Sequence, residues 1–117
     1  MKRQIDTLDF ASSFQVGHAG AFELAERIGA LAPPGLDRVF FTNSGSEAID
    51  TALKIALAVA RATGQGQKNL FIGRERGFHG VGFGGISVGG MTNNRRAFGG
   101  ALLRCDHLRS TWDPATQ

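Results

Sequence analysis

A short apolar run that passes through a tight polar turn directly into a helix restricts the fold of this chain more than any other feature. Residues 38–42 are rich in β-branched and aromatic side chains, which is typical of a buried strand. The chain turns at residues 43–45, and apolar residues then recur at helical spacing over residues 46–63. A second run of strand character follows at residues 69–73. Strand, helix and strand in this order predict a right-handed crossover in a parallel sheet, and therefore an α/β fold.

The segments on either side of this unit are less uniform. An amphipathic helix is expected at residues 20–32, because apolar side chains recur there at helical spacing. Pro33 ends it, since a proline disfavours helical geometry in the preceding residue and has no backbone N–H to donate. Seven of the 17 glycines fall within residues 77–90, so neither a helix nor a strand is assigned to that segment. Residues 101–103 hint at one more strand.

The composition is that of a small globular domain. The 117 residues are 42% hydrophobic and 20% charged, close to globular averages, and no stretch approaches the roughly 18 unbroken apolar residues of a membrane-spanning helix. The single cysteine, Cys105, fits a reducing compartment, and the first residues lack the apolar segment of a secretion signal. The net charge of +3 is spread along the chain, unlike the basic stripe of a nucleic-acid-binding protein. We therefore expect a cytoplasmic protein with no nucleic-acid or membrane partner.

The turn at residues 43–48, Asn-Ser-Gly-Ser-Glu-Ala, is a candidate anion site. The first backbone N–H groups of a helix have no partner within the helix and lie at the positive end of its dipole, which suits a phosphate. Gly45 would let the backbone approach the anion closely, and Ser46 would add a hydroxyl donor. Ser44 and Glu47, however, also have the spacing of a capping box, which satisfies the same end of the helix without a ligand. Spacing alone leaves both interpretations open.

A second motif, at residues 80–85, matches the dinucleotide-binding fingerprint Gly-x-Gly-x-x-Gly. The match starts seven residues after the predicted strand ends at Gly73, and it leads into a segment that is a poor helix. Asp106 has about the right spacing for the acidic residue that binds a ribose, but nothing around it has the required strand character. A dinucleotide site is therefore the less favoured interpretation.

Phe78 and His79 follow the second predicted strand, so they can reach the same sheet edge as residues 44–47. A planar aromatic side chain there could stack on a flat heterocycle, with the imidazole beside it. An aromatic–histidine pair of this kind is also common as plain packing. The residues alone leave both possibilities open.

Residues 36–56, which contain the Asn-Ser-Gly-Ser-Glu-Ala turn, strongly resemble the phosphate-binding segment of the class III (ω-amino acid) aminotransferases. Residues 72–90 resemble the next block of the branch that includes the β-alanine (ω-amino acid):pyruvate transaminases, and residues 21–28 resemble the preceding helix. The resemblance extends over roughly residues 14–113. Two long blocks in the same order and separation are very specific.

This resemblance implies a pyridoxal 5′-phosphate cofactor and part of the fold-type I large domain, a three-layer αβα arrangement with a mostly parallel sheet. Gly45 and Ser46 would bind the cofactor phosphate, with Ser44 adjacent. Phe78 lies where the family usually has a tyrosine that stacks on the pyridine ring, so the stacking would be kept and the phenolic hydroxyl lost. His79 would lie next to the ring. No metal site is implied.

The resemblance also implies what the chain lacks. The family's chemistry needs a lysine that forms a Schiff base with the cofactor and a carboxylate that pairs with the pyridine nitrogen, and both lie well beyond this segment. Lys2 is terminal, Lys54 lies within a predicted helix and Lys68 precedes a predicted strand, so none has the required context. Residues 1–117 are therefore expected to be a partial large domain, without the small amino-terminal domain, the catalytic-lysine region or the carboxy-terminal domain. No catalytic residue is assigned.

The parent enzyme, a homodimer in this family, would move an amino group from an ω-amino acid or amine to a keto acid such as pyruvate. This chain alone is expected to be inactive. One alternative is a non-catalytic, truncated remnant that binds phosphate weakly or not at all. Another is a nucleotide-binding module, which only the fingerprint at residues 80–85 supports.

Overall fold

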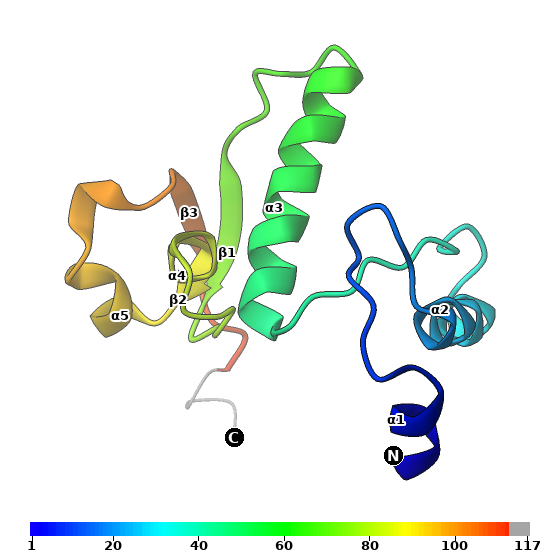
Figure 1. Cartoon of the computed structure of the whole chain (residues 1–117). Helices are drawn as coiled ribbons and strands as arrows, with labels where there is room; N and C mark the ends of the chain where they lie inside the picture. The colour runs from blue at the N-terminus through cyan, green and yellow to red at the C-terminus, as the bar shows by residue number, and fades with distance from the viewer. Residues whose placement is uncertain (113–117) are drawn as a thin grey trace. The chain divides into compact units, whose positions relative to one another are not determined.

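The protein is described by a computed structural model, which describes residues 1–112. These fall into two compact units, one comprising Met1–Phe40 and one that begins at Phe41. The first unit contains helices α1 (Lys2–Leu8) and α2 (Ala19–Leu31) (Figure 1). The helix predicted at residues 20–32 is thus confirmed as α2.

Local chemistry sets both ends of α2. The imidazole of His18 accepts a hydrogen bond from the backbone N–H of Gly20 at 3.0 Å, in the manner of an N-cap. At the other end, Ala32 has an extended backbone (φ −76°, ψ 158°) directly before Pro33, as the restriction on residues that precede proline requires. The helix therefore begins after the capping residue His18 and ends before Pro33.

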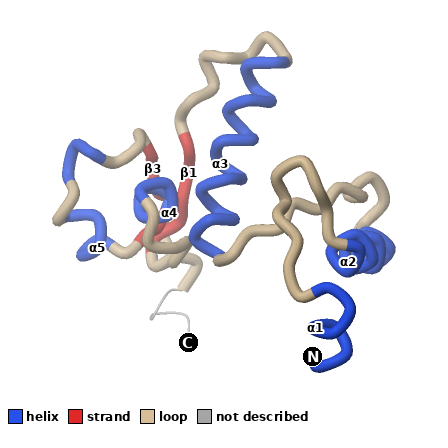
Figure 2. Tube along the Cα trace, viewed as in Figure 1, coloured by secondary structure: helices blue, strands red, loops and turns tan. Residues whose placement is uncertain are grey.

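The second unit is built on a three-stranded parallel sheet with the strand order β2-β1-β3. Figure 2 shows β1 and β3 as neighbours, and β2 pairs with the other edge of β1. Its elements are α3 (Gly45–Ala62), β1 (Phe71–Glu75), α4 (Phe83–Val88), β2 (Gly89–Gly90), α5 (Thr92–Arg96), the 3₁₀ helix η1 (Gly99–Ala101) and β3 (Cys105–Leu108). An α/β fold with a parallel sheet is therefore confirmed.

The helix predicted at residues 46–63 is confirmed as α3. It begins at Gly45, after the N-cap Ser44, and ends at Ala62. Gly64 follows with φ +74°, the left-handed conformation in which helices often end. Helix α3 packs against α4, so its amphipathic pattern gives it one face towards the rest of the unit.

The strand positions differ from the sequence predictions. Residues 38–42 form no strand in the described part of the chain, and Phe40 is exposed. Strand β1 starts two residues later than the predicted residues 69–73, and the hint of a strand at residues 101–103 is wrong, because a 3₁₀ helix ends there and β3 follows it. Side-chain propensity marks a segment that tolerates an extended backbone, but a strand also needs a neighbour to pair with, and this is decided elsewhere in the chain.

The glycine-rich residues 77–90 are ordered into a loop, helix α4 and strand β2, although no element was assigned to them from the sequence. Ser87 and Val88, at the end of α4, are buried. The hydroxyl of Ser87 donates to the carbonyl of Phe83 at 2.5 Å and accepts from the backbone N–H of Leu103 at 2.8 Å. One serine therefore joins α4 to the segment that leads into β3.

Replacing Ser87 with alanine is expected to lower the free energy of unfolding by about 1–3 kcal/mol, because it leaves the half-buried N–H of Leu103 without its acceptor. Urea unfolding followed by circular dichroism measures the change. Ser13→Ala, an exposed serine in the first unit, is the control and should change it by less than about 0.5 kcal/mol. Equal effects of the two substitutions would contradict the assigned role of Ser87.

Candidate functional site

The amino-terminal end of α3 is closed by a reciprocal pair of hydrogen bonds. The hydroxyl of Ser44 accepts from the backbone N–H of Glu47 at 3.2 Å, and the carboxylate of Glu47 accepts from the backbone N–H of Asn43 at 2.9 Å. These are the two contacts of the capping box that the spacing predicted, so the capping box itself is confirmed. The side chain of Ser44 is thereby engaged within the helix end itself.

The capping box leaves the first turn of α3 open to an anion. The backbone N–H groups of Gly45 and Ser46 come first in the helix, and such groups have no intrahelical acceptor. No described atom lies within 4 Å of the position that a β-carbon on Gly45 would take, so the backbone is accessible there. Capping and anion binding are therefore compatible at this helix end, since they use different N–H groups.

The hydroxyl of Ser46 connects α3 to the glycine-rich segment. Its oxygen accepts a hydrogen bond from the backbone N–H of Val81 at 3.1 Å. A hydroxyl has one hydrogen to donate besides its two acceptor positions. The Ser46 hydroxyl can therefore hold Val81 and still donate to a ligand at the helix end.

A concave site of about 330 Å³ lies at this junction and is lined by Gly45, Ser46, Ile49, Phe78, His79 and Gly80. Its size is at the lower end of the range for small-molecule sites. Four of the five predicted binding residues line it, and Ser44 does not. The structure thus brings together the helix end and the aromatic–histidine pair, which are separated by more than 30 residues in the sequence.

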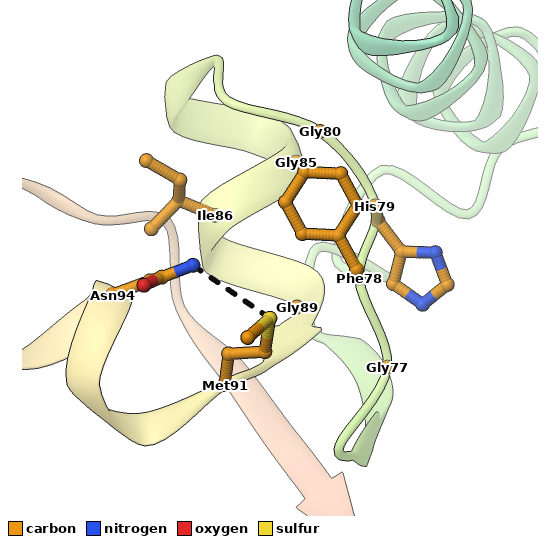
Figure 3. Close-up of a pocket in the computed structure, with 9 residues that line it drawn as sticks. All are labelled: Gly77, Phe78, His79, Gly80, Gly85, Ile86, Gly89, Met91 and Asn94. Atoms are coloured by element: carbon orange, nitrogen blue, oxygen red, sulfur yellow. Dashed lines mark hydrogen bonds between the residues drawn. The ribbon is translucent and has the colours of Figure 1, made fainter.

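Phe78 and His79 also line a second, much smaller hollow on the side of α4 and α5 (Figure 3). There the amide of Asn94 donates to the sulfur of Met91 at 3.7 Å. The volume of about 10 Å³ is close to that of a single water molecule. Of these two hollows in the described structure, only the larger has room for a ligand of cofactor size. Phe78 is 61% exposed, which leaves part of its aromatic side chain available for stacking.

Asp50 is a residue of this region that the sequence predictions missed. It lies one helical turn beyond Ser46 on α3, and its carboxylate accepts from the backbone N–H of Gly85 at 2.8 Å. Gly85 is in the first turn of α4, whose own N-cap, Gly82, has no side chain to offer. The spacing of Ser46 and Asp50 on one helix face was the available signal, but it did not reveal what they contact.

This contact argues against a dinucleotide site at residues 80–85. The fingerprint does lead into a helix, contrary to the sequence prediction, because α4 spans Phe83–Val88. The phosphates of a dinucleotide would, however, bind at the start of that helix. The carboxylate of Asp50 already occupies the N–H of Gly85 there, and its negative charge would repel a phosphate.

Neither a lysine nor a cysteine side chain belongs to the lining of the larger site. None of its lining residues is a lysine, and Lys2, Lys54 and Lys68 all lie outside the lining. Burial raises the pKa of Cys105 above its ordinary value, which disfavours the reactive thiolate, and Cys105 lies in β3 outside the lining. The helix-end amides, the Ser46 hydroxyl and the Phe78 ring can bind and orient a ligand. No described helix is long and apolar enough to cross a membrane.

The family model and the similar proteins all indicate the same family. The family model described as aminotransferase class-III matches residues 1–112. The chain is 58% identical over 111 residues to an omega-aminotransferase of Caulobacter vibrioides, covering 95% of this chain and 25% of that protein. It is 51% identical over 112 residues to a beta-alanine–pyruvate aminotransferase of Pseudomonas aeruginosa, covering 96% of this chain and 25% of that protein. The chain thus spans about a quarter of the length of these relatives.

Solved structures show the same fold. A thermostable omega transaminase mutant from Pseudomonas jessenii superposes with a TM-score of 0.87 at 36% identity, covering 99% of this chain and 27% of that one. An amine transaminase from an uncultivated Pseudomonas species, in its PLP-bound form, gives a TM-score of 0.85 at 33% identity, covering 98% of this chain and 27% of that one. Because the family model matches residues 1–112 of the 117, the chain belongs to the class-III aminotransferases.

Proposed function

We propose that this chain is the pyridoxal-phosphate-binding part of an enzyme that moves an amino group from an ω-amino acid or amine to a keto acid such as pyruvate. Relatives whose names state an omega-aminotransferase and a beta-alanine–pyruvate aminotransferase support the reaction class. The observation that carries the cofactor assignment is the concave site in which the open end of α3 meets Phe78 and His79.

The phosphate end of the proposed site is the first turn of α3. The N–H groups of Gly45 and Ser46 would donate to the phosphate, together with the hydroxyl hydrogen that Ser46 retains beside its bond to Val81. The helix dipole adds a favourable field. Ser44 supports this end by capping the helix rather than by lining the site.

The ring end of the proposed site is the Phe78–His79 segment. Phe78 offers an exposed aromatic face for stacking on a pyridine ring, and His79 lies beside it in the lining. Phenylalanine has no hydroxyl, so any hydrogen bond from this position to cofactor or substrate is absent. We therefore assign orientation of the ring by stacking to Phe78 and make no proton-transfer assignment to it.

Bound pyridoxal phosphate supplies the electron sink that aminotransfer needs. The residues of this chain would bind its phosphate, hold its ring and keep water away from one ring face. No lysine lines the site, so we propose that residues 1–117, as a partial large domain, do not catalyse amino transfer alone. The enzyme to which the segment belongs would act on small amines and keto acids, as a homodimer.

Titration of the chain with pyridoxal phosphate and with inorganic phosphate, by calorimetry, tests this proposal. Ser46→Ala is expected to weaken both affinities by about tenfold, because it removes a hydrogen bond to a charged group. Ser13→Ala, an exposed serine in the first unit, is the matched control and should leave both affinities unchanged. Equal affinities for the wild type and Ser46→Ala would contradict the assignment of the phosphate end.

The same titration separates the alternatives. A remnant without a cofactor role would bind neither ligand, or would bind phosphate as tightly as pyridoxal phosphate. An assay with β-alanine and pyruvate should give no alanine from this chain, and alanine formation would contradict the proposed inactivity.

A further inference from the structure

Two side chains on one face of α3 hold the glycine-rich segment at two points. The hydroxyl of Ser46 accepts from the N–H of Val81 at 3.1 Å, and the carboxylate of Asp50 accepts from the N–H of Gly85 at 2.8 Å. The two residues of each pair are 35 positions apart. Two side chains one turn apart on α3 therefore bind two backbone amides that are also four residues apart, at the start of α4. Phe78 and His79 lie just before these two attachment points.

The surroundings of Asp50 fit this role closely. Gly84 passes so near the carboxylate that a β-carbon there would lie 2.6 Å from one of its oxygens, and a β-carbon on Gly82 would also overlap it. The carboxylate thus lies against the backbone of the first turn of α4, half-buried and with a hydrogen bond to it. It replaces the capping side chain that Gly82 lacks, and its charge complements the positive end of that helix.

We infer that Asp50 is a positioning residue, which sets the distance between the phosphate end of the site on α3 and the ring end at Phe78 and His79. The inference rests on the proposed function, which assigns the cofactor phosphate to the end on α3 and the cofactor ring to the end at Phe78 and His79. Asp50 itself is outside the lining of the site. Loss of its contact frees the start of α4 and leaves the segment that carries Phe78 held to α3 only through the bond between Val81 and Ser46. The first turn of α3 keeps its own capping box.

The test compares Asp50→Ala with Asp50→Asn, because an asparagine keeps an oxygen that accepts from Gly85 and an alanine does not. Asp50→Ala should lower the affinity for pyridoxal phosphate by about tenfold and leave the affinity for inorganic phosphate within about twofold, since only the larger ligand needs both ends. Asp50→Asn should keep most of the wild-type affinity for pyridoxal phosphate. Lys54→Ala, an exposed position one turn further along α3, is the control and should change neither affinity.

A merely structural role gives a different result. If Asp50 only stabilised the fold, Asp50→Ala would weaken both ligands equally, and this outcome overturns the inference. An unchanged affinity for pyridoxal phosphate in Asp50→Ala overturns it as well. If the wild type binds neither ligand, the proposed function fails, and the role of Asp50 in positioning its ligand fails with it.

Amide hydrogen exchange measures the contact itself, independently of any ligand. Exchange at the N–H of Gly85 should be about tenfold faster in Asp50→Ala and close to wild type in Asp50→Asn. Unchanged exchange in Asp50→Ala would show that the carboxylate does not hold the start of α4, and would overturn the inference even where the titration agrees with it.

Discussion

Replacing Gly80 with valine is expected to abolish measurable binding of pyridoxal phosphate and to lower the free energy of unfolding by about 3 kcal/mol. Gly80 has φ +111°, a conformation that a β-branched residue does not adopt without strain. A β-carbon at this position would also lie 2.7 Å from the hydroxyl oxygen of Ser46 and 2.8 Å from its α-carbon. The valine must therefore push the glycine-rich segment off α3, which separates Phe78 from the phosphate end of the site.

Calorimetric titration and urea unfolding measure the two parts of this result. Gly100→Ala is the matched control, because no described atom lies within 4 Å of its β-carbon position and its φ is not in the left-handed region. It should change the free energy of unfolding by less than about 1 kcal/mol. A Gly80→Val protein with wild-type affinity would show that the approach of residue 80 to Ser46 is not needed for the site.

Replacing Gly73 with alanine should be comparably damaging, although Gly73 lies outside the site. A β-carbon there would overlap the backbone carbonyl of Val88 and lie 3.1 Å from the ring of His107. The imidazole of His107 occupies the space above Gly73. Its Nε2 donates to the carbonyl of Gly89 at 2.9 Å, so this side chain of β3 joins the two outer strands across β1. We expect a loss of about 1–3 kcal/mol in the free energy of unfolding.

Two comparisons sharpen this second prediction. His107→Ala combined with Gly73→Ala should restore little stability, because the tightest overlap involves the backbone of Val88 and not the imidazole. Gly66→Ala should cost far less in urea unfolding, since the nearest atom to its β-carbon position is 3.9 Å away. Full recovery in the double variant would show instead that the ring of His107, and not Val88, limits the space above Gly73.

The helices α2 and α3 were predicted well because their signals are local. Apolar periodicity, a proline after α2 and the capping box at Ser44 and Glu47 all act within a few residues of the helix they define. Strands were predicted poorly: residues 38–42 have strand composition but no strand in the described structure, and β3 at Cys105–Leu108 was not recognised. A strand depends on partners that are distant in the sequence, and composition does not identify them.

Helix α4 shows the same limit at the candidate site. Its sequence is rich in glycine and its N-cap is Gly82, so nothing within Phe83–Val88 marks a helix start. The capping group comes from Asp50, 35 residues earlier. Gly45, Ser46, Phe78 and His79 were named from the sequence, and they line one site in the structure, but their binding of a cofactor stays a prediction.

The sequence by itself determined the positions of α2 and α3, the spacing of the capping box and the resemblance to the family, because each depends on side-chain pattern along continuous stretches. The α/β class was predicted correctly, although one of the two strands used to predict it, at residues 38–42, is not formed in the described structure. Only the tertiary structure decided where the strands pair, that residues 80–85 pack against α3, and that Ser46 and Asp50 hold that segment in place. The physical reason is that these features are contacts between backbone groups and side chains far apart in the chain. The backbone amides of Val81 and Gly85 carry no local sequence signal of their acceptors, and only folding brings Ser46 and Asp50 to them.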